Sequence, residues 1–321
     1  MIKAGIIGGA GYTAGELIRI LLFHPEVELV FVHSTSNAGN KLYDVHEGIF
    51  GDTEMCFSSE YDLNAVDVLF LCSGHGKSTE FWSQNERPAG LKVIDLAQDY
   101  RDQHDGYVYG LPEWQKDRIE GSALIANPGC FATAIQLALL PLAAAGLLKD
   151  EIQVTAITGS TGAGVKPGAT THFSWRDNNL SAYKVFEHQH LLEIKRDLKL
   201  LGNMPEEPVI NFVPMRGDFA RGIFASVYTA CELDEEAAVK LYKDYYGSAA
   251  FTHVCDKSID LKQVVNTNKA LVHVEKHGDK LVVSSIIDNL LKGASGQAVQ
   301  NMNIIFGLPE DTGLKLKASA F

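Results

Sequence analysis

The sequence contains few cysteines and none of the spacings that hold metals. Its 321 residues include five cysteines, and an odd number argues against a disulfide framework. There is no Cys-x-x-Cys pair and no Cys/His spacing typical of zinc, so we expect no bound metal. Unpaired thiols persist in reducing compartments, which favours a cytoplasmic protein.

Basic clusters and long apolar runs are also missing. The formal net charge is −12, and no group of Lys and Arg is dense enough to follow a phosphate backbone, so we expect no nucleic-acid partner. Residues 1–5 lead into a predicted strand without an apolar signal region, and no run approaches the ~18 apolar residues of a membrane helix. The chain is long enough for two globular domains.

A glycine-rich turn between a strand and a helix stands near the N-terminus. We predict strands at Lys3–Ile7 and Glu28–His33, and the helix between them follows a G-x-G-x-x-A turn at Gly9, Gly11 and Ala14. Glycine permits a tight turn and a close approach to a pyrophosphate, which the helix N-terminus attracts. This unit predicts a dinucleotide site, with a purely structural turn as the alternative. The candidate contacts are Gly8, Gly9, Gly11, Tyr12, Thr13 and Ala14.

The second predicted strand ends without the carboxylate that usually binds the ribose 2′-hydroxyl of NAD. Ser34, Thr35 and Ser36 follow it instead. A carboxylate would repel a 2′-phosphate, whereas hydroxyl groups can donate hydrogen bonds to it. We therefore predict NADP as the cofactor and these three residues as its contacts.

Two loops that follow later predicted strands are further candidates, because loops at the carboxyl ends of parallel strands line the cofactor crevice. Strand Asp67–Cys72 leads to Ser73 and His75, which are candidate cofactor contacts. Capping the loop is the alternative for His75. Strand Leu91–Asp95 leads to Arg101, which could bind an anionic substrate or remain an ordinary surface residue.

Cys130 lies in a predicted strand-to-helix turn. The apolar residues 122–125 predict a buried strand, Pro128 and Gly129 force a turn, and residues 131–145 predict a helix. A helix N-terminus lowers the pKa of a thiol because free N–H groups favour the thiolate, and the same groups can bind an oxyanion. Cys130 is therefore a candidate nucleophile, with a small buried cysteine as the alternative.

Two segments of the second half are further candidates for holding the cofactor. A loop of small residues after the predicted strand 151–158 presents many N–H groups, and a plain hairpin connection is the alternative there. The predicted C-terminal helix 295–306, which Ser295 can N-cap, is rich in side-chain amides that suit a nicotinamide carboxamide. The candidate contacts are Ser160, Gly162, Gly164, Gln297 and Asn301.

A pair of histidines, His188 and His190, precedes another predicted helix. Their i, i+2 spacing does not match the HExxH pattern of zinc proteases. Histidine transfers protons near neutral pH, so one of them is a candidate acid/base if Cys130 is a nucleophile. A surface or structural pair is the alternative.

The order of these elements predicts an α/β chain with two domains. We expect a Rossmann-type, doubly wound NADP-binding domain from residues 1–130 and 295–321. Predicted strands at 222–231, 251–254, 270–275 and 281–287, with a helix at 234–246, favour an α+β domain with a mostly antiparallel sheet. This catalytic and substrate domain would span residues 131–294. One face of such a sheet often packs in a dimer, so we expect a homodimer or homotetramer.

The ordered motifs resemble the N-acetyl-gamma-glutamyl-phosphate reductase family of arginine biosynthesis and, more distantly, aspartate-semialdehyde dehydrogenase. The resemblance covers essentially the full length, and the order of the motifs is more specific than any one of them. They are the glycine turn with Tyr12 and Glu16-Leu17, Asp95-Leu96 with Asp99–Arg101, Tyr109–Glu113, Asn127–Cys130, Gly159–Gly164, His188-x-His190 with Glu193-Ile194, and Lys292–Ala298.

The resemblance implies that Cys130 is the nucleophile, that His188 is the acid/base, and that NADPH binds at the glycine turn. It implies reduction of N-acetyl-gamma-glutamyl phosphate to the semialdehyde and phosphate through a thioester on Cys130. The candidate substrate contacts are Arg101, Asn127, His190, Arg216 and Arg221.

The chain departs from the family pattern at Pro214-Met215-Arg216, where the family usually has Pro-His-Leu. An extra Arg there could bind an extra carboxylate, as in an N-succinyl substrate. The same chemistry could also act on an N-acyl-aminoadipyl or aspartyl phosphate. A protein that binds NADP without turnover is the competing class. A 2-hydroxy-acid dehydrogenase would leave Cys130 unexplained.

Overall fold

Residues 1–319 are described by the computed structural model and fall into two units. Unit 1 contains residues 1–128 and 294–315, and unit 2 contains residues 129–293 and 316–319. The predicted division assigned residues 316–321 to the first domain. Residues 316–319 group with unit 2 instead, where the N–H of Ser319 donates to the carbonyl of Val265 at 3.3 Å. Residues 320 and 321 lie outside the described residues.

Short apolar strands of unit 1 pair into a six-stranded parallel sheet in the order β2-β1-β3-β4-β6-β5. Strands of this kind are apolar on both faces because helices cover both faces of the sheet. The sheet confirms the predicted doubly wound class. The strands are β1 (Ile2–Ile7), β2 (Val27–His33), β3 (Val68–Leu71), β4 (Lys92–Asp95), β5 (Val108–Tyr109) and β6 (Leu124–Ala126).

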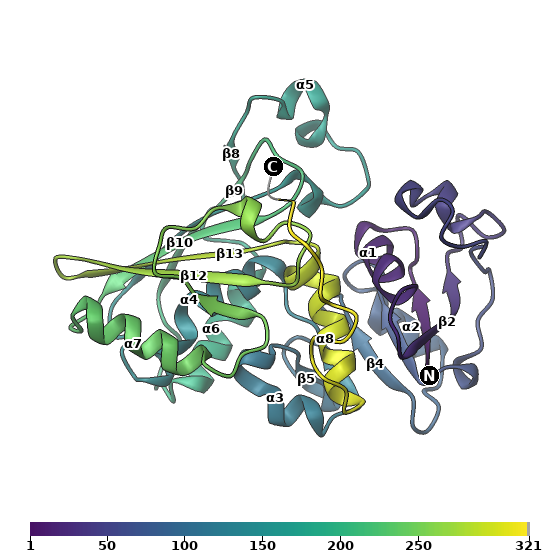
Figure 1. Ribbon diagram of the computed structural model, residues 1–321, viewed down its shortest axis with the longest axis horizontal. Coiled ribbons are helices and arrows are strands. Elements are labelled where there is room, and N and C mark those ends of the chain that lie inside the picture. The colour runs from purple at the N-terminus through teal and green to yellow at the C-terminus, as the bar shows by residue number, and fades with distance from the viewer. Residues whose placement is uncertain (320–321) are drawn as a thin grey trace. The chain divides into compact units, whose positions relative to one another are not determined.

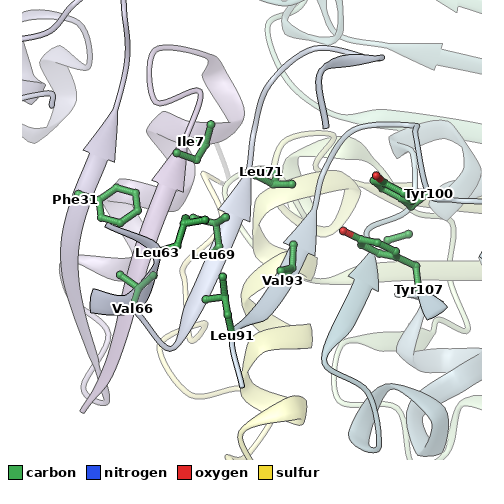
Figure 2. Packing of buried hydrophobic residues seen from close by; sticks show 11 residues of the cluster. Ile7, Phe31, Leu63, Val66, Leu69, Leu71, Leu91, Val93, Tyr100 and Tyr107 are labelled. Atoms are coloured by element: carbon green, nitrogen blue, oxygen red, sulfur yellow. The ribbon is translucent and has the colours of Figure 1, made fainter. Parts of the chain in front are cut away.

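The C-terminal helix of unit 1 returns to the N-terminal elements. In Figure 1 this helix, α8, is drawn in yellow and runs beside β4, and it also packs against α1 and α3. One part of the core of unit 1 joins Ile7, Phe31 and Leu69 from three neighbouring strands (Figure 2). The helices of unit 1 are α1 (Tyr12–Leu21), α2 (Lys77–Gln84), α3 (Pro112–Glu120) and α8 (Gly296–Ile305).

Ser295 is the N-cap residue of α8, as predicted, but its side chain does not cap the helix. Ser295 has helical backbone angles (φ −72°, ψ −36°), and its hydroxyl donates to the carbonyl of Thr13 at 2.7 Å. A π-helical turn, Leu291–Ser295, leads directly into α8. Because that turn already continues the helical hydrogen bonding, no capping side chain is required at Ser295.

Unit 2 contains a seven-stranded mixed sheet in the order β11-β12-β13-β10-β7-β9-β8. Four of its neighbouring pairs are antiparallel, and β7–β9 and β11–β12 are parallel. This confirms the predicted mostly antiparallel sheet, although β9, which contains Pro214, was not predicted as a strand. The strands are β7 (Ile152–Thr158), β8 (Ser181–Ala182), β9 (Ile210–Arg216), β10 (Ile223–Ala230), β11 (Thr252–Val254), β12 (Ala270–His277) and β13 (Lys280–Ile287).

Helix α4 forms the centre of unit 2. It packs on β10, β12 and β13 and against α6 and α7. Pro141 lies inside α4 and has no N–H for the carbonyl of Leu137. The Tyr246 hydroxyl of α7 donates to that carbonyl at 2.6 Å, so the buried oxygen keeps a partner. The helices of unit 2 are α4 (Cys130–Ala144), α5 (Phe173–Arg176), α6 (His190–Leu201) and α7 (Glu235–Tyr246).

Helices long and apolar enough to cross a bilayer are absent from the described part of the chain.

Candidate active site

The three glycines of the turn in unit 1 differ in what surrounds them. Gly8 has a left-handed φ of +82°, and a Cβ there would lie 2.8 Å from the backbone nitrogen of Ser73. A Cβ at Gly9 would overlap the side chain of Val32. A Cβ at Gly11 would meet no atom of the described residues within 4 Å, so open space lies next to this position.

The N-terminus of α1 is open to an anion. Gly11 is the N-cap, and within residues 1–319 no side chain caps the helix and its first turn has no acidic residue. Tyr12 is 41% exposed, Thr13 is half-buried, and Ala14 is buried. Free N–H groups and the helix dipole suit a pyrophosphate at such an end, so the residues present fit a dinucleotide.

The residues after β2 present hydroxyl groups. Ser34 is buried, and Thr35 is exposed. The amide of Asn37 donates to the hydroxyl of Ser34 at 3.4 Å and to that of Ser36 at 3.0 Å. Because residues 33–37 contain no carboxylate, a 2′-phosphate would meet hydrogen-bond donors here rather than a negative charge.

The N-terminus of α2 is already occupied by a carboxylate of the chain itself. Asp99 accepts the N–H groups of Gly76 at 2.6 Å, Ser78 at 3.0 Å and Thr79 at 3.1 Å. The ring of His75 accepts the N–H of Gln98 at 3.1 Å. His75 therefore fastens its loop, and α2 keeps no free N-terminal charge for a phosphate beside Ser73.

The small-residue loop after β7 uses its backbone donors within unit 2. The N–H of Ser160 donates to the carbonyl of Phe219 at 2.8 Å, and Gly162 and Gly164 donate to carbonyls of the loop itself. A Cβ at Gly159 would overlap the backbone of Ala220. The loop is therefore built around a neighbouring segment, and these N–H groups are not available to a cofactor phosphate.

The predicted polar contacts of unit 1 form an internal network. The amide of Asn301 donates to the carbonyl of Gly110 at 2.9 Å and to the amide oxygen of Asn127 at 3.2 Å. The amide of Asn127 donates in turn to the carbonyl of Ala294 at 3.0 Å, and Arg101 donates to the carbonyl of Asn127 at 3.0 Å. These three side chains, like that of Gln297, are buried. They hold the end of β6 rather than project as free donors.

Cys130 is the first residue of α4 and is half-buried. Its helix begins at the N-cap Gly129, whose N–H donates to Glu193 of α6 at 3.1 Å. A Cβ at Gly293 would lie 2.9 Å from the Cβ of Cys130, so a glycine is required beside the thiol. The structure thus places the sulfur at a helix N-terminus, as the sequence predicted.

His188 lies in an apolar cage next to the Cys130 turn. Phe131, the residue after the cysteine, packs edge-on against the His188 ring with centroids 5.3 Å apart, and Phe212 does so at 5.6 Å. Burial lowers the pKa of His188 to about 4, and the positive charges of Lys184 and Arg216 add to this. His188 is therefore neutral at physiological pH.

The hydrogen bonding of His188 fixes which ring nitrogen carries the proton. The N–H of His190 donates to Nδ1 of His188 at 3.2 Å. Since Nδ1 accepts, the neutral ring carries its proton on Nε2. His190 itself is buried as the first residue of α6, so it orients its neighbour through the backbone.

Tyr183 packs against the candidate histidine and was not among the predicted site residues. Its ring meets that of His188 at 5.8 Å. Burial and the negative charge of Cys130 raise the pKa of Tyr183 to about 12, while Arg216 opposes the shift. The guanidinium of Arg216 stacks over the Tyr183 ring at 4.7 Å. In the sequence, the only indication of this role was that Tyr183 lies five residues before His188.

The backbone before His188 is strained. Lys184 (φ +45°) and Phe186 (φ +62°) adopt left-handed angles that bulky residues avoid. Strain of this kind costs about 1–3 kcal/mol per residue and clusters at functional sites. It persists here because β9 holds the segment: the N–H of Phe186 donates to the carbonyl of Phe212 at 2.9 Å.

The two candidate arginines of unit 2 differ in their partners. Arg221 forms a two-point ion pair with the buried Asp288, with N–O distances of 3.0 and 3.2 Å. The Nε of Arg216 is buried and has no hydrogen-bond partner in the described chain. Arg216 is thus the arginine that retains an unused donor. Glu193 and Asp288, which position Gly129 and Arg221, were not predicted as site residues, because their partners are distant in sequence.

Groups of three or more His, Cys, Asp or Glu side chains placed to hold a metal are absent from residues 1–319.

Comparison with known families covers both units. Residues 3–122 match the family described as "Semialdehyde dehydrogenase, NAD binding domain", and residues 130–289 match "Semialdehyde dehydrogenase, dimerisation domain". Relatives named N-acetyl-gamma-glutamyl-phosphate reductase are 60% identical in Phocaeicola vulgatus and 59% identical in Bacteroides thetaiotaomicron. Each alignment covers 100% of this chain and 100% of the relative.

Similar solved structures are aspartate-semialdehyde dehydrogenases. The Vibrio cholerae enzyme II in complex with ASA has a TM-score of 0.75 at 17% identity, covering 96% of this chain and 98% of that chain. The Candida albicans enzyme with NADP has a TM-score of 0.70 at 16% identity, covering 95% and 98%. At these identities the likeness shows the fold alone.

Proposed function

We propose a function from one premise, that the chain belongs to the N-acetyl-gamma-glutamyl-phosphate reductase family. The protein is an oxidoreductase of arginine biosynthesis that reduces N-acetyl-gamma-glutamyl phosphate to N-acetylglutamate semialdehyde, with release of phosphate. The observation that carries the proposal is Cys130 at the first position of α4, with the neutral His188 caged against the next residue.

Cys130 is the proposed nucleophile. Its sulfur attacks the acyl carbon, the bond from that carbon to the phosphate oxygen breaks, and phosphate leaves to give a thioester on Cys130. The N–H groups of the first turn of α4 favour negative charge on the sulfur and on the acyl oxygen. After reduction the carbon–sulfur bond breaks, which releases the aldehyde and restores the thiolate.

His188 is the proposed proton-handling residue. Its Nε2–H can donate a hydrogen bond to the acyl oxygen as negative charge develops there. The low pKa of the ring supports a neutral donor rather than a stored imidazolium, because the caged ring disfavours positive charge. A hydrogen-bond donor to a developing oxyanion is typically worth ~10²–10³-fold in kcat.

NADPH is the proposed cofactor, held in unit 1 by the open N-terminus of α1, with the Ser34–Ser36 segment for its 2′-phosphate. When bound, it supplies the hydride that takes the acyl carbon to the aldehyde level. The uncapped Gly11 turn supports a dinucleotide at this place. The absence of acid from residues 33–37 supports NADPH over NADH.

We further propose that the chain acts as a homodimer or homotetramer in the cytoplasm. The match of residues 130–289 to a dimerisation domain supports self-association. On β10, Tyr228 is 43% exposed while its neighbour Val227 is buried, so one face of the sheet is accessible to a second copy. The odd number of cysteines, five, is compatible with a reducing compartment.

Arg216 supports a second candidate substrate, the N-succinyl analogue. Its buried Nε lacks a partner within the described residues, and its guanidinium lies over the ring of Tyr183, which packs against His188. A terminal carboxylate on the acyl group would supply that partner. The test compares kcat/KM for N-acetyl and N-succinyl substrates in wild type and Arg216→Ala. Loss of a succinyl preference in the variant supports the role, and equal preference in both proteins contradicts it.

The activity itself is tested in reverse. Wild-type protein should reduce NADP with N-acetylglutamate semialdehyde only when inorganic phosphate is present, because phosphate must cleave the thioester. Turnover without phosphate would contradict an acyl-phosphate reaction. No turnover with either the acetyl or the succinyl semialdehyde would contradict the proposed substrate class.

A further inference from the structure

The peptide of Gly9 is held on both sides by residues outside the glycine turn. Its N–H donates to the carbonyl of His33 at the end of β2, at 2.9 Å. Its carbonyl is bonded by Nε2 of His46 at 2.8 Å. A carbonyl can only accept, so the proton of His46 is on Nε2. The first glycine of the turn is therefore fixed by two hydrogen bonds of the protein itself.

His46 reaches Gly9 from a well-anchored segment. It lies between two short 3-10 turns, Leu42–Asp44 and Glu47–Ile49. Leu42 and Ile49 are buried, and the N–H of His46 donates to the carbonyl of Leu42 at 2.9 Å. Because this segment is anchored, the His46 side chain is held in place next to the glycine turn.

Gly15 explains how the ring of His46 fits. A Cβ at Gly15 would lie 2.6 Å from Nδ1 and 2.9 Å from Cε1 of His46. Gly15 is inside α1, where glycine is less favourable than alanine. Its backbone has no left-handed φ that would require glycine. The imidazole of His46 therefore accounts for the missing side chain at position 15.

We propose that His46 is a positioning residue for the dinucleotide turn and that Gly15 exists to admit it. By holding the carbonyl of Gly9, His46 fixes the peptides of the turn before the nucleotide arrives. Binding then costs less ordering of the backbone, which raises affinity. The inference rests on the proposed function only in that a dinucleotide binds at this turn.

The experiment measures NADPH binding by fluorescence titration of the full chain without acyl substrate, together with the melting temperature of the nucleotide-free protein. His46→Ala should raise the Kd for NADPH about tenfold, the size expected for the loss of one part-buried hydrogen bond. His46→Gln, which retains an N–H donor, should recover part of the loss. His104→Ala is the matched control, because His104 lies in the same unit and its side chain is 45% exposed.

A second pair of variants tests the contact with Gly15. In wild type, Gly15→Ala should weaken NADPH binding because the new methyl group displaces the His46 ring. In the His46→Ala background the same change should leave the Kd unaltered within twofold and raise the melting temperature, since alanine favours the helix. If Gly15→Ala merely damaged the fold, it would be harmful in both backgrounds, so a harmful effect in wild type alone indicates the contact with His46.

In steady-state assays His46→Ala should raise the KM for NADPH and leave kcat within about twofold, because the residue acts on the cofactor turn alone. The inference is overturned if His46→Ala binds NADPH as tightly as wild type, or if Gly15→Ala is equally harmful in both backgrounds. Failure of wild type to bind NADPH would instead overturn the proposed cofactor. If His46→Ala does not fold, His46→Gln and the single Gly15→Ala variant still decide the question.

Discussion

Two strand-to-helix turns of the molecule share a plan and differ in what their helix N-terminus faces. The turn after β1 leads through Gly11 into α1, and the turn after β6 leads through Gly129 into α4. Within residues 1–319, neither N-cap uses a side chain and neither first turn carries an acidic residue. Both helices therefore begin with N–H groups that attract negative charge.

The two turns differ in which group stands at the helix N-terminus. Next to Gly11 there is open space, which suits an external phosphate. After Gly129 the chain supplies its own sulfur, Cys130, and Glu193 accepts the N–H of the glycine. At a third turn, before α2, the carboxylate of Asp99 accepts the N–H of Gly76 and so offsets the partial positive charge of the helix N-terminus. A helix N-terminus thus becomes a ligand site, a reactive thiol or a plain cap according to which neighbour fills it.

The largest expected effect is loss of the sulfur. Cys130→Ala should lower kcat by roughly 10⁴-fold or more, because no other group can form the thioester. Its Kd for NADPH should stay within twofold of wild type, since the glycine turn is unchanged. Cys255→Ala is the control, because Cys255 is another half-buried thiol of unit 2. Activity in Cys130→Ala near the wild-type level would remove the distinction between the two turns.

Converting the open turn into a capped one should have the next largest effect. Gly11→Asp places a good N-cap side chain where space is open, and its charge repels phosphate. The Kd for NADPH should rise by roughly 10²-fold while the melting temperature rises or stays constant. Gly11→Asn provides a similar cap without the charge and should lose less affinity. Equal losses in the two variants would show that only bulk matters.

The support of the Cys130 turn can be removed from α6. Glu193→Ala leaves the buried N–H of Gly129 without its acceptor, a defect worth ~1–3 kcal/mol. We expect kcat to fall roughly tenfold, with slower alkylation of Cys130 by iodoacetamide. Glu193→Gln retains an acceptor oxygen and should stay near wild type. Identical behaviour of the Ala and Gln variants would count against a positioning role for Glu193.

The low pKa of His188 predicts a stability change with pH. In the unfolded chain this histidine gains a proton near its ordinary value of 6.5, whereas in the folded protein it stays neutral until pH about 4. Stability is therefore complete above pH 6.5 and declines as pH falls toward 4. Between pH 7 and pH 5, wild type should lose about 1–2 kcal/mol more unfolding free energy than His188→Gln, measured by urea titration. An equal loss in both proteins would indicate an accessible, chargeable ring.

The smallest effect is expected at the capped helix. Asp99→Ala removes the acceptor of three N–H groups at α2 and should lower the unfolding free energy by about 1 kcal/mol. The Kd for NADPH should change by less than twofold, because this turn is not proposed to hold phosphate. A tenfold change in that Kd would place α2 among the cofactor contacts.

Local signals predicted much of this fold. The glycine turn, the Cys130 turn and the mostly antiparallel second sheet follow from short apolar runs and from Gly and Pro, which act on their immediate neighbours. Ser295 is the N-cap residue as predicted, but its side chain caps nothing, because the preceding residues form a π-helical turn. The strand Ile210–Arg216 was not predicted because it contains a proline, which usually argues against a strand.

Tertiary contacts explain what the sequence could not predict in the candidate site. Asn127 and Asn301 were candidates for binding ligands, but they bond to each other across 174 residues of sequence. Asp99 caps a helix that begins about 20 residues earlier, and Glu193 supports a glycine 64 residues away. Polar residues of this kind have the same local signature whether they hold a ligand or the fold.

The most direct test of the account is to trap the acyl group on the chain. Wild-type protein mixed with N-acetyl-gamma-glutamyl phosphate in the absence of nucleotide should release about one equivalent of phosphate and retain the N-acetylglutamyl group as a thioester. Peptide mass spectrometry should locate it on Cys130, and subsequent NADPH should remove it as the semialdehyde. An adduct elsewhere, or the same adduct yield in Cys130→Ala, would contradict the claim that the turn before α4 supplies the nucleophile.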